Sequence, residues 1–540
     1  MSDLLAESSA ADHGTRAGSA REVELKLRVP PDRLEQLAAC PVLADRAIGP
    51  MRRRELASTY FDTADQRLAR RGLALRVRRI GRRRIQTLKA APEAASALFD
   101  RAEWEVPITG EVPDLAAFPD AAAREAVGLV LPGELVPVFE TRIERTELAI
   151  GWPSRERPEA VIAVAIDRGI ICAQGKEEPV SELELELERG PERALAALAE
   201  ALRGVAPLAV ETRDKAARGW ALAAGLVPPP RKAAKLELEP ELAVAEAFRR
   251  IGRACLGHWL ANEVPAADGR DVEGVHQLRV ALRRLRSAFS IFRSVLPEAD
   301  RERFVGELRW LLGELGPARD RDVLAHDLLP PLRGSGVLEG ELAALDDALG
   351  RGRPALYERV RAALSSRRYA DLVLDLAIWL ELERFVDGAS AEARAVLEGP
   401  VLPFARDALE RRWRKARKRG RKFEKLGAEE RHALRIAIKK LRYGLDFFAG
   451  LWPGSAARKF ARHLAELQDR LGHLNDVVVA EGLARAVAAE TRGEPAGGAV
   501  ALAAGAVIGW YARATERMLR EAAERWEAFA EQEPFWRETA

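Results

Sequence analysis

The fold of the N-terminal half is decided by one short stretch, Arg21-Glu22-Val23-Glu24-Leu25-Lys26-Leu27-Arg28. Apolar and charged residues alternate along it, and this period of two predicts a β-strand with Glu22, Glu24 and Lys26 on one face. Such a strand either faces bulk water or lines a polar cavity. Two carboxylates two residues apart suit a hard cation such as Mg²⁺, and the lysine next to them on that face suits a phosphate oxygen.

The same arrangement recurs in later segments up to about residue 222, where charged residues share one face and small or branched apolar residues share the other. These segments predict either a two-layer sheet with one wet face or a barrel with a charged lumen. A lumen explains why acids and bases both recur, because a polyphosphate chain with bound metal needs basic groups for its oxygens and acidic groups for its metals. The charged residues concerned are Arg52, Arg54, Arg76, Arg78, Lys89, Arg101, Glu103, Glu105, Arg142, Arg145, Asp167, Glu182, Glu184 and Glu186.

Length and composition limit the possible classes of protein. At 540 residues, with 48% hydrophobic and 31% charged residues, the chain should hold two or three domains with sizeable cores. The net charge is only +3, so anion binding must come from local clusters. Cys40, Cys172 and Cys255 have no metal-site spacing and predict reduced thiols in a cytoplasmic protein. No export signal is visible, and the apolar run from Gly497 to Trp510 is too short for a membrane span, so it predicts a buried helix.

The chain divides where strand alternation gives way to Ala, Leu, Arg and Glu at helical spacing. A proline-rich segment at that point predicts a stiff linker. We therefore expect an α+β protein with a strand-rich domain followed by an all-α helical bundle. The predicted parts are a disordered tail at 1–20, the strand-rich domain at 21–226, the linker at 227–239, and the helical domain at 240–540 with halves at about 240–395 and 396–540.

The helical part contains an internal repeat at an offset of 156 residues. The first copy, His276-Gln-Leu-Arg279-Val-Ala-Leu-Arg283-Arg284-Leu-Arg286, matches His432-Ala-Leu-Arg435-Ile-Ala-Ile-Lys439-Lys440-Leu-Arg442. Leu315-Gly316 and Asp320 match Leu471-Gly472 and Asp476 at the same offset. The repeat predicts two similar halves related by a pseudo-twofold axis.

Each copy of the repeat places a basic stripe beside a core stripe on one helix. Like charges at this spacing repel. The repulsion is relieved if a polyanion binds there, or if Asp320, Asp322 and Asp476 pair with the stripe; a solvated helix face is the simpler alternative. Further basic residues crowd the segment from Arg411 to Lys422. The candidate anion-binding residues are His276, Arg279, Arg283, Arg286, His432, Arg435, Lys439 and Arg442.

Glu22-x-Glu24-x-Lys26 resembles the ExExK signature of the CYTH domain, the triphosphate tunnel metalloenzymes. Further motifs follow in the family's order over about residues 19–222, among them Leu75-Arg76-Val77-Arg78, Gln86-Thr-Leu-Lys89, Ser181-Glu-Leu-Glu-Leu-Glu-Leu and Lys215-Ala-Ala-Arg218. The resemblance implies an eight-stranded antiparallel β-barrel around a tunnel. The family includes inorganic triphosphatases, thiamine triphosphatases and class IV adenylate cyclases.

The resemblance also implies roles for single residues and a cofactor, Mg²⁺ or Mn²⁺. The implied metal ligands are Glu22, Glu24, Glu184 and Glu186. The implied catalytic residues are Lys26, Asp167 and Lys215. The implied phosphate-binding residues are Arg52, Arg54, Arg76, Arg78, Lys89, Arg142 and Arg145.

The repeated His-x-x-Arg motifs, with the Leu-Gly-x-x-Arg/Asn-Asp segments at 315–320 and 471–476, resemble the CHAD domain, a helical family associated with binding inorganic polyphosphate. The resemblance covers about residues 240–535. Asn475 stands where the first copy has Arg319, so the second half is expected to bind less tightly there.

The leading hypothesis is therefore a cytoplasmic, metal-dependent inorganic triphosphatase that binds polyphosphate through its helical domain, at polyphosphate granules and without a membrane. Adenylate cyclase or thiamine and nucleoside triphosphatase activity is an alternative, because the tunnel residues specify the triphosphate and leave the attached group open. A non-catalytic polyphosphate-binding protein is a second alternative. An RNA-binding module is disfavoured, because only 6% of the residues are aromatic and stacking platforms are scarce.

Overall fold

The structure is a computed structural model that describes residues 20–90, 98–128, 130, 132–225 and 227–537. The chain divides into two compact units, one of Met1–Pro228 with Ala370–Leu382 and one of Pro229–Tyr369 with Glu383–Ala540. Residues 1–19 of the predicted tail lie outside the described residues, and Ala20 begins the first strand.

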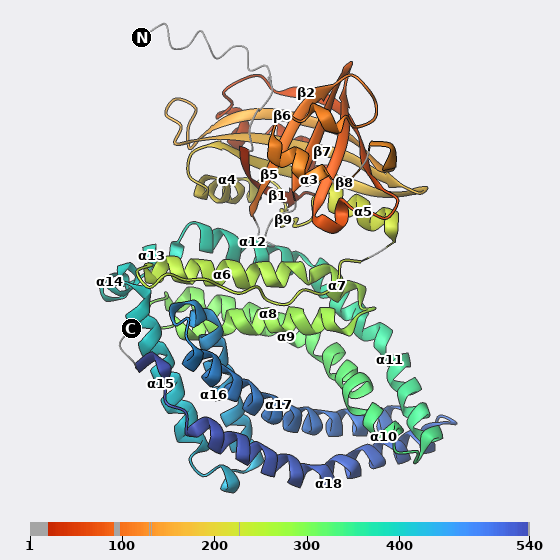
Figure 1. The fold of residues 1–540 in the computed structure, drawn as a ribbon, viewed down its shortest axis with the longest axis vertical. Coiled ribbons are helices and arrows are strands. Elements are labelled where there is room, and N and C mark those ends of the chain that lie inside the picture. The colour runs from red at the N-terminus through yellow and green to blue at the C-terminus, as the bar shows by residue number, and fades with distance from the viewer. Residues whose placement is uncertain (1–19, 91–97, 129, 131, 226, 538–540) are drawn as a thin grey trace. The chain divides into compact units, whose positions relative to one another are not determined.

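The first unit is built on an antiparallel sheet (Figure 1). Its strands run in the order β5-β4-β3-β2-β6-β7-β8-β1-β9, and β5 also pairs with β1. Within the described residues the sheet has nine strands instead of the predicted eight, because a two-residue strand, β9, hydrogen-bonds to the end of β1. The strands are β1 (Ala20–Arg28), β2 (Arg52–Thr63), β3 (Leu73–Ile80), β4 (Arg83–Ala90), β5 (Leu98–Ile108), β6 (Leu135–Trp152), β7 (Ala160–Ala173), β8 (Lys176–Arg189) and β9 (Ala209–Val210).

Short helices accompany the sheet, and the one nearest the charged residues is α5 (Lys215–Ala224). Its N-cap is Asp214, whose carboxylate accepts a hydrogen bond from the Ala217 amide at 2.7 Å, so the helix begins at Lys215. A Cβ at Gly219 would lie 2.1 Å from the Phe139 ring, so only glycine allows α5 this close to β6. The other helices of this unit are α1 (Leu34–Ala38), α2 (Pro41–Ala44), α3 (Ala121–Val127), α4 (Arg193–Arg203) and most of α12 (Arg367–Glu381).

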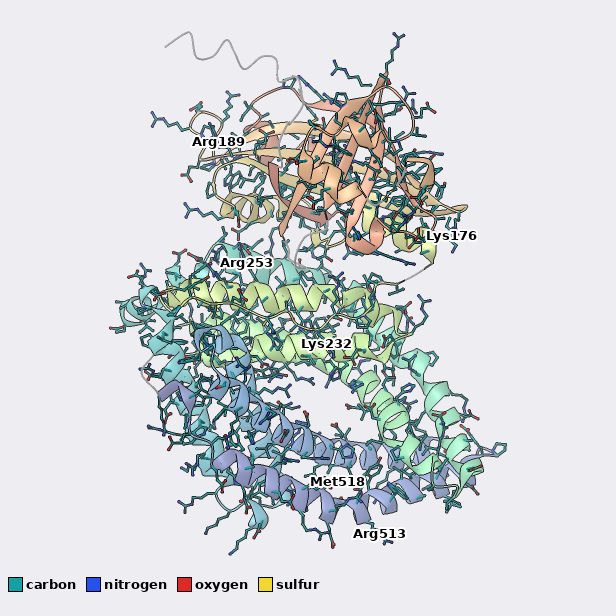
Figure 2. All side chains as sticks on the ribbon, in the orientation of Figure 1. Lys176, Arg189, Lys232, Arg253, Arg513 and Met518 are labelled. Carbon is teal, nitrogen blue, oxygen red and sulfur yellow. The ribbon has the colours of Figure 1, made fainter. Side chains whose placement is uncertain are left out.

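An apolar cluster holds α5 against the sheet. It joins Ala216 and Ala223 of the helix to side chains from β2, β6, β7 and β8. The ends of β8, Lys176 and Arg189, are labelled in Figure 2. The strand side chains of the cluster are Leu56, Tyr60, Phe139, Ile143, Ile171, Ala173 and Val180.

The second unit is helical, as the spacing predicted. The segment predicted as a linker ends against it: the Arg231 carbonyl accepts a hydrogen bond from the Asn262 side chain at 2.8 Å, and Leu238 is buried. The helices are α6 (Val244–Ala261), α7 (Glu263–Asp268), α8 (Val272–Ile291), α9 (Glu298–Val323), α10 (Pro330–Arg333), α11 (Glu339–Ser365), α13 (Arg384–Asp387), α14 (Ala391–Glu398), α15 (Val401–Gly420), α16 (Ala428–Phe448), α17 (Ser455–Glu490) and α18 (Gly497–Ala530).

The two sequence repeats occupy α8 with α9 and α16 with α17. The predicted core stripe of α8 is buried, including Leu278, Leu282 and Leu285. The apolar run predicted as a buried helix lies in α18, which runs beside α17 (Figure 1). Val500 and Val507 of α18 are buried, but Leu502 and Trp510 are exposed, so the run forms a helix buried on one side only and not the buried helix that was predicted. None of the helices that the structure describes is long and apolar enough to cross a membrane.

Candidate functional site

Strand register brings acidic and basic side chains together in the first unit. β1 and β8 are antiparallel, and their pairing sets Glu24 opposite Glu186 and Lys26 opposite Glu184. On the next strands, Asp167 of β7 lies opposite Arg145 of β6 and also opposite Glu182 of β8. Directly opposed side chains on one face lie close enough to interact. The register therefore gathers a mixed-charge group across four strands.

Lys26 and Arg145 connect the acids of this group. The Lys26 Nζ atom lies 2.7 Å from Glu24 and 3.0 Å from Glu184. Arg145 donates two hydrogen bonds to Asp167, at 2.7 and 2.6 Å, and contacts Glu184 at 2.5 Å. Glu24, Lys26 and Asp167 are buried. Buried charges require such partners, because an isolated one is very costly.

Lys215, at the start of α5, completes the network. Its Nζ atom lies 2.8 Å from Asp167, 2.7 Å from Glu182 and 2.8 Å from Glu184. Burial by itself lowers the pKa of Lys215, but Asp167 and Glu184 raise it well above its usual range. In turn burial raises the pKa of Glu184, but Lys215, Lys26 and Arg145 hold it well below its usual range. These side chains are therefore charged at neutral pH.

Among the residues that the structure describes, one group of acids could hold a metal ion: Asp167, Glu182 and Glu184. One carboxylate oxygen from each lies within 4.8 Å of the others. Carboxylate oxygens are the ligands that Mg²⁺ and Mn²⁺ prefer. The chemistry of these donors suits a divalent metal, but in this structure Lys215 already balances the charge of the three acids. The Lys215 ammonium contacts all three acids and supplies the positive charge at their centre.

A second group of charged residues lies on β3, β4 and β5. Arg76 is 3.7 Å from both Glu103 and Glu105, and Lys89 is 2.8 Å from Glu103. Burial by itself lowers the pKa of Arg76, but Tyr60, Glu103 and Glu105 raise it above its usual range. The predicted cations Arg76 and Lys89 thus share one acidic partner, Glu103.

Arg78 differs from its neighbours, because it has no ion pair within 4 Å among the residues that the structure describes. Its Nε atom donates a hydrogen bond to Ser58 at 3.2 Å. Burial, together with Arg76 and Arg145, lowers the pKa of Arg78 to about 10. A half-buried cation that is short of negative charge favours a bound anion.

The other predicted residues lie at the edge of this group or outside it. Arg54 is half-buried, 3.7 Å from Glu147, and Arg52 is exposed. Arg142 lies on the opposite face of β6 from Arg145; its side chain is 65% exposed and pairs with Glu140 at 3.4 Å. Glu186 is half-buried. Glu22 lies in β1, but its side chain is outside the described residues.

Three residues of the site were given no role in the prediction: Ser58, Tyr60 and Arg218, although Arg218 belongs to the quoted motif Lys215-Ala-Ala-Arg218. Arg218 follows Lys215 by one helical turn, pairs with Glu182, and contacts Glu178 at 2.7 Å. Its spacing from Lys215 was the available signal. Ser58 shows no signal in the sequence, whereas Tyr60 begins the family-like segment Tyr60-Phe61-Asp62-Thr63. The proximity of both residues to Arg78 and Arg76 depends on the pairing of β2 with β3.

In the helical unit, the basic stripes of α8 and α16 influence each other. Burial, then Arg435, Arg283 and Arg279, lower the pKa of Lys439 to about 7, and Asp476 opposes them. Burial and Arg283 likewise lower the pKa of Arg279 to about 10. Of the described residues, no carboxylate forms an ion pair within 4 Å of these cations. The two stripes therefore form one basic surface with excess positive charge.

The remaining residues of the stripes differ in their surroundings. Burial and Arg319 lower the pKa of His276 to about 4, so it is neutral at pH 7. The His432 Nδ1 atom lies 3.2 Å from the Asn475 side-chain oxygen, and Arg442 lies 3.7 Å from Asp469. Burial and Arg309 lower the pKa of Arg286.

Two family models match this chain. The CYTH domain model matches residues 20–220, and the CHAD domain model matches residues 250–485. The chain therefore contains a CYTH domain followed by a CHAD domain, which confirms both resemblances.

Curated relatives match parts of the chain. An inorganic triphosphatase of Haemophilus influenzae is 32% identical over 204 residues, which are 37% of this chain and 55% of that protein. An uncharacterised protein of Mycobacterium tuberculosis is 31% identical over 235 residues, 41% of this chain and 42% of that protein. The chain thus spans about half the length of these relatives. The CHAD domain of the plant Ricinus communis is a solved structure with 33% identity and a TM-score of 0.47, covering 55% of this chain and 96% of that one.

Proposed function

We propose that this protein hydrolyses inorganic triphosphate with the help of a divalent metal in its CYTH domain and binds inorganic polyphosphate through its CHAD domain. The observation that carries the proposal is the network of Glu24, Lys26, Arg145, Asp167 and Lys215, of which all but the half-buried Arg145 are buried. It combines carboxylates, which can bind a metal, with cations, which can bind phosphate oxygens. The name of the Haemophilus influenzae relative supports triphosphate as the substrate. The pairing of β5 with β1 supports a sheet that surrounds a tunnel.

Glu24, Glu184 and Glu186, with Glu22 from the same strand as Glu24, would hold the metal. A bound divalent metal offsets phosphate charge and lowers the pKa of a water that it holds. Lys26, Arg76, Arg78, Lys89 and Arg145 would bind the triphosphate oxygens. Their cationic groups would stabilise the negative charge that grows on those oxygens in the transition state.

Asp167 has a positioning role in this proposal. It accepts hydrogen bonds from Arg145 and contacts Lys215 at 2.8 Å. Burial raises its pKa, but Arg145 and Lys215 outweigh burial and lower it. A carboxylate held by two cations is a weak base, so Asp167 orients Arg145 and Lys215 towards the phosphate.

The CHAD domain would bind polyphosphate along the surface of Arg279, Arg283, Arg435 and Lys439. A polyanion would relieve the repulsion among these cations and release counterions, as nucleic acids do when they bind basic proteins. We further propose a cytoplasmic location at polyphosphate granules, where this ligand is concentrated.

The test is phosphate release from tripolyphosphate, ATP and thiamine triphosphate by the full chain with Mg²⁺ and then with Mn²⁺. We expect tripolyphosphate to be hydrolysed fastest and chelation of the metal to stop release. Faster turnover of ATP or thiamine triphosphate would assign a different substrate. No metal-dependent release from any of the three would overturn the enzymatic proposal.

A further inference from the structure

The Lys215 ammonium group lies among the acids whose chemistry suits a divalent metal. Its Nζ atom contacts one carboxylate oxygen of each acid: Oδ2 of Asp167 at 2.8 Å, Oε2 of Glu182 at 2.7 Å and Oε1 of Glu184 at 2.8 Å. An ammonium group has three N–H donors, so these three contacts match all of them. The side chain is buried. Lys215 is thus held by the oxygens that a metal would also use.

Both oxygens of Glu184 already have cationic partners. Oε1 accepts hydrogen bonds from Lys215 at 2.8 Å and from Lys26 at 3.0 Å, and Oε2 accepts one from Arg145 at 2.5 Å. A carboxylate oxygen has about two lone-pair positions, so Oε1 has none left. Glu184 belongs both to the acidic group and to the proposed metal ligands. A metal that binds at Oε1 must therefore displace one of the two ammonium groups.

Lys215 is the ammonium group whose departure frees the most oxygens. It releases one oxygen from each of three acids, and divalent metals of this kind need several oxygen ligands. None of the three acids is then left without a cation. Asp167 keeps two hydrogen bonds from Arg145, and Glu182 keeps its ion pair with Arg218. Glu184 keeps Arg145 and Lys26.

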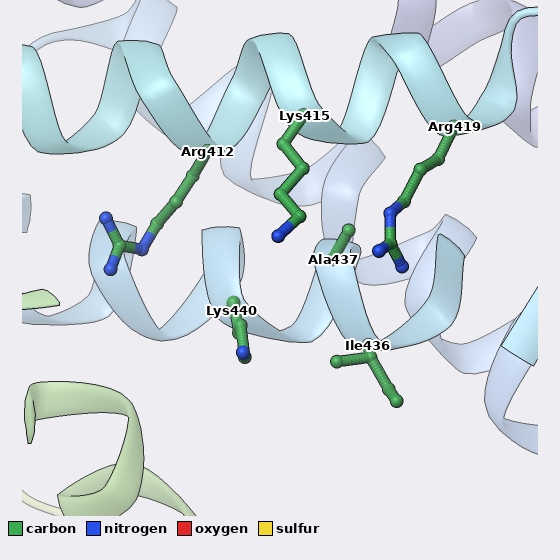
Figure 3. Close-up of a pocket in the computed structure, with 6 residues that line it drawn as sticks. All are labelled: Arg412, Lys415, Arg419, Ile436, Ala437 and Lys440. Carbon is green, nitrogen blue, oxygen red and sulfur yellow. The ribbon is translucent and has the colours of Figure 1, made fainter. Parts of the chain in front are cut away.

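Lysines of the helical unit are placed in the opposite way. A small cavity of about 70 Å³ lies between α15 and α16, and Figure 3 shows its lining: Arg412, Lys415, Arg419, Ile436, Ala437 and Lys440. In the described part of the chain, no carboxylate lies within 4 Å of the ammonium groups of Lys415 and Lys440. These two lysines need no displacement before they meet an anion, whereas Lys215 must first leave its acids.

We propose that Lys215 is the built-in counter-cation of this acidic group, and that a divalent metal binds Glu184 by displacing the Lys215 ammonium group. The inference rests on the divalent metal of the proposed function. Once displaced, the ammonium group carries a charge that its three acids no longer balance, and it can bind a phosphate oxygen. The metal therefore has to bind before Lys215 can contact the substrate.

The test is Mn²⁺ binding by the full chain and two variants, without phosphate, with free Mn²⁺ measured by electron paramagnetic resonance. Lys215→Met removes the ammonium group and keeps an unbranched side chain. Arg218→Met is the control, because it removes another cation from Glu182 and leaves Lys215 in place. We expect Lys215→Met to bind Mn²⁺ at least about tenfold more tightly than the unchanged chain, and Arg218→Met to differ from it by less than about threefold.

Thermal unfolding separates displacement from a purely structural role of Lys215. Both variants leave buried acids with one cation fewer, so both should melt below the unchanged chain when no metal is added. Added Mn²⁺ should raise the Tm of Lys215→Met the most, because a ligand that binds the folded state stabilises it. Lys215→Gln, whose amide can still donate to the acids, is the second variant if Lys215→Met does not fold, and the same results are expected of it.

Two results would overturn the inference: equal Mn²⁺ affinities with and without the Lys215 ammonium group, or equally tighter binding in the Arg218→Met control. Phosphate release from tripolyphosphate by the unchanged chain tests the proposed function separately. Metal-dependent release together with equal Mn²⁺ affinities would reject only the displacement of Lys215. Tighter Mn²⁺ binding by the Lys215 variant without any release by the unchanged chain would support the displacement and reject the hydrolysis.

Discussion

Lys215 of the CYTH domain contacts three carboxylates within 2.8 Å, whereas Lys439 of the CHAD domain has no carboxylate partner within 4 Å among the described residues. Both side chains belong to groups of charged residues, but the first group is of mixed charge and the second is basic. The acids around Lys215 outweigh the effect of burial and raise its pKa. Around Lys439, burial and neighbouring arginines together lower the pKa to about 7. The first arrangement suits a ligand that brings metal and phosphate together, and the second suits a bare polyanion.

The largest expected effect separates the two regions by activity. Lys26→Ala should lower tripolyphosphate turnover at least about a hundredfold, because it removes a buried cation that would face the phosphate. Polyphosphate binding should stay within about twofold, since that ligand uses the other domain. Phosphate release and a binding titration measure the two properties. Lys176→Ala, at the exposed end of β8, is the lysine-matched control. Near-normal turnover in Lys26→Ala would reject the proposed site.

The second prediction concerns stability. Arg145→Met should lower the free energy of unfolding of the CYTH domain by about 3–5 kcal/mol, because it leaves Asp167 and Glu184 buried with one partner fewer. Arg283→Met should leave the CHAD domain unchanged or slightly more stable in phosphate-free buffer, because it removes a repelling charge. Hydrogen exchange in β6 and β7, and in α8, measures each domain by itself. Equal destabilisation by both changes would contradict the contrast in charge balance.

Salt should distinguish the two regions next. Raising the salt concentration from 50 to 200 mM should weaken polyphosphate binding on the order of ten- to a hundredfold through lost counterion release. The KM for tripolyphosphate should change by only about threefold, because buried charges are screened less. Titrations and initial rates at four salt concentrations measure both. A salt-insensitive polyphosphate affinity would argue against ion pairing on the CHAD surface.

The smallest effect is on pH dependence. The pKa of Lys439 lies near 7 in the folded chain, below its usual 10.5, so the side chain loses its charge as the pH rises through about 7. Arg435 of the same helix, Arg279 and Arg283 of α8 and Asp476 of α17 surround it. A bound polyanion needs the charged form, so polyphosphate affinity should fall a few-fold between pH 6 and pH 8. Lys439→Arg stays charged and should flatten this profile; an unchanged profile would exclude Lys439 as its source.

Local patterns predicted much of both domains. The alternation of residues 21–28 is found in the structure as β1. The 3.6-residue period correctly predicted the buried stripe of α8. Arg142 and Arg145 show where the prediction was too broad: residues three apart on a strand point to opposite faces, and only Arg145 reaches the acids.

Contacts between distant segments were harder to predict. Lys215 meets Asp167 and Glu184 because Asp214 starts α5 at that point and Gly219 lets the helix approach β6. The run of cations from Arg411 to Lys422 was visible, but its division into a cavity lining and an exposed face depends on how α15 packs against α16. No spacing rule within one segment carries this information.

The amino-acid sequence alone determined the strand and helix periods, the repeat, and the two families to which its motifs belong, because each of these is written in neighbouring residues. Tertiary structure decided which charges are balanced and which are not. The reason is physical: the energy of a buried charge depends on its distance to partners that lie up to 158 residues away in the chain, as for Lys26 and Glu184.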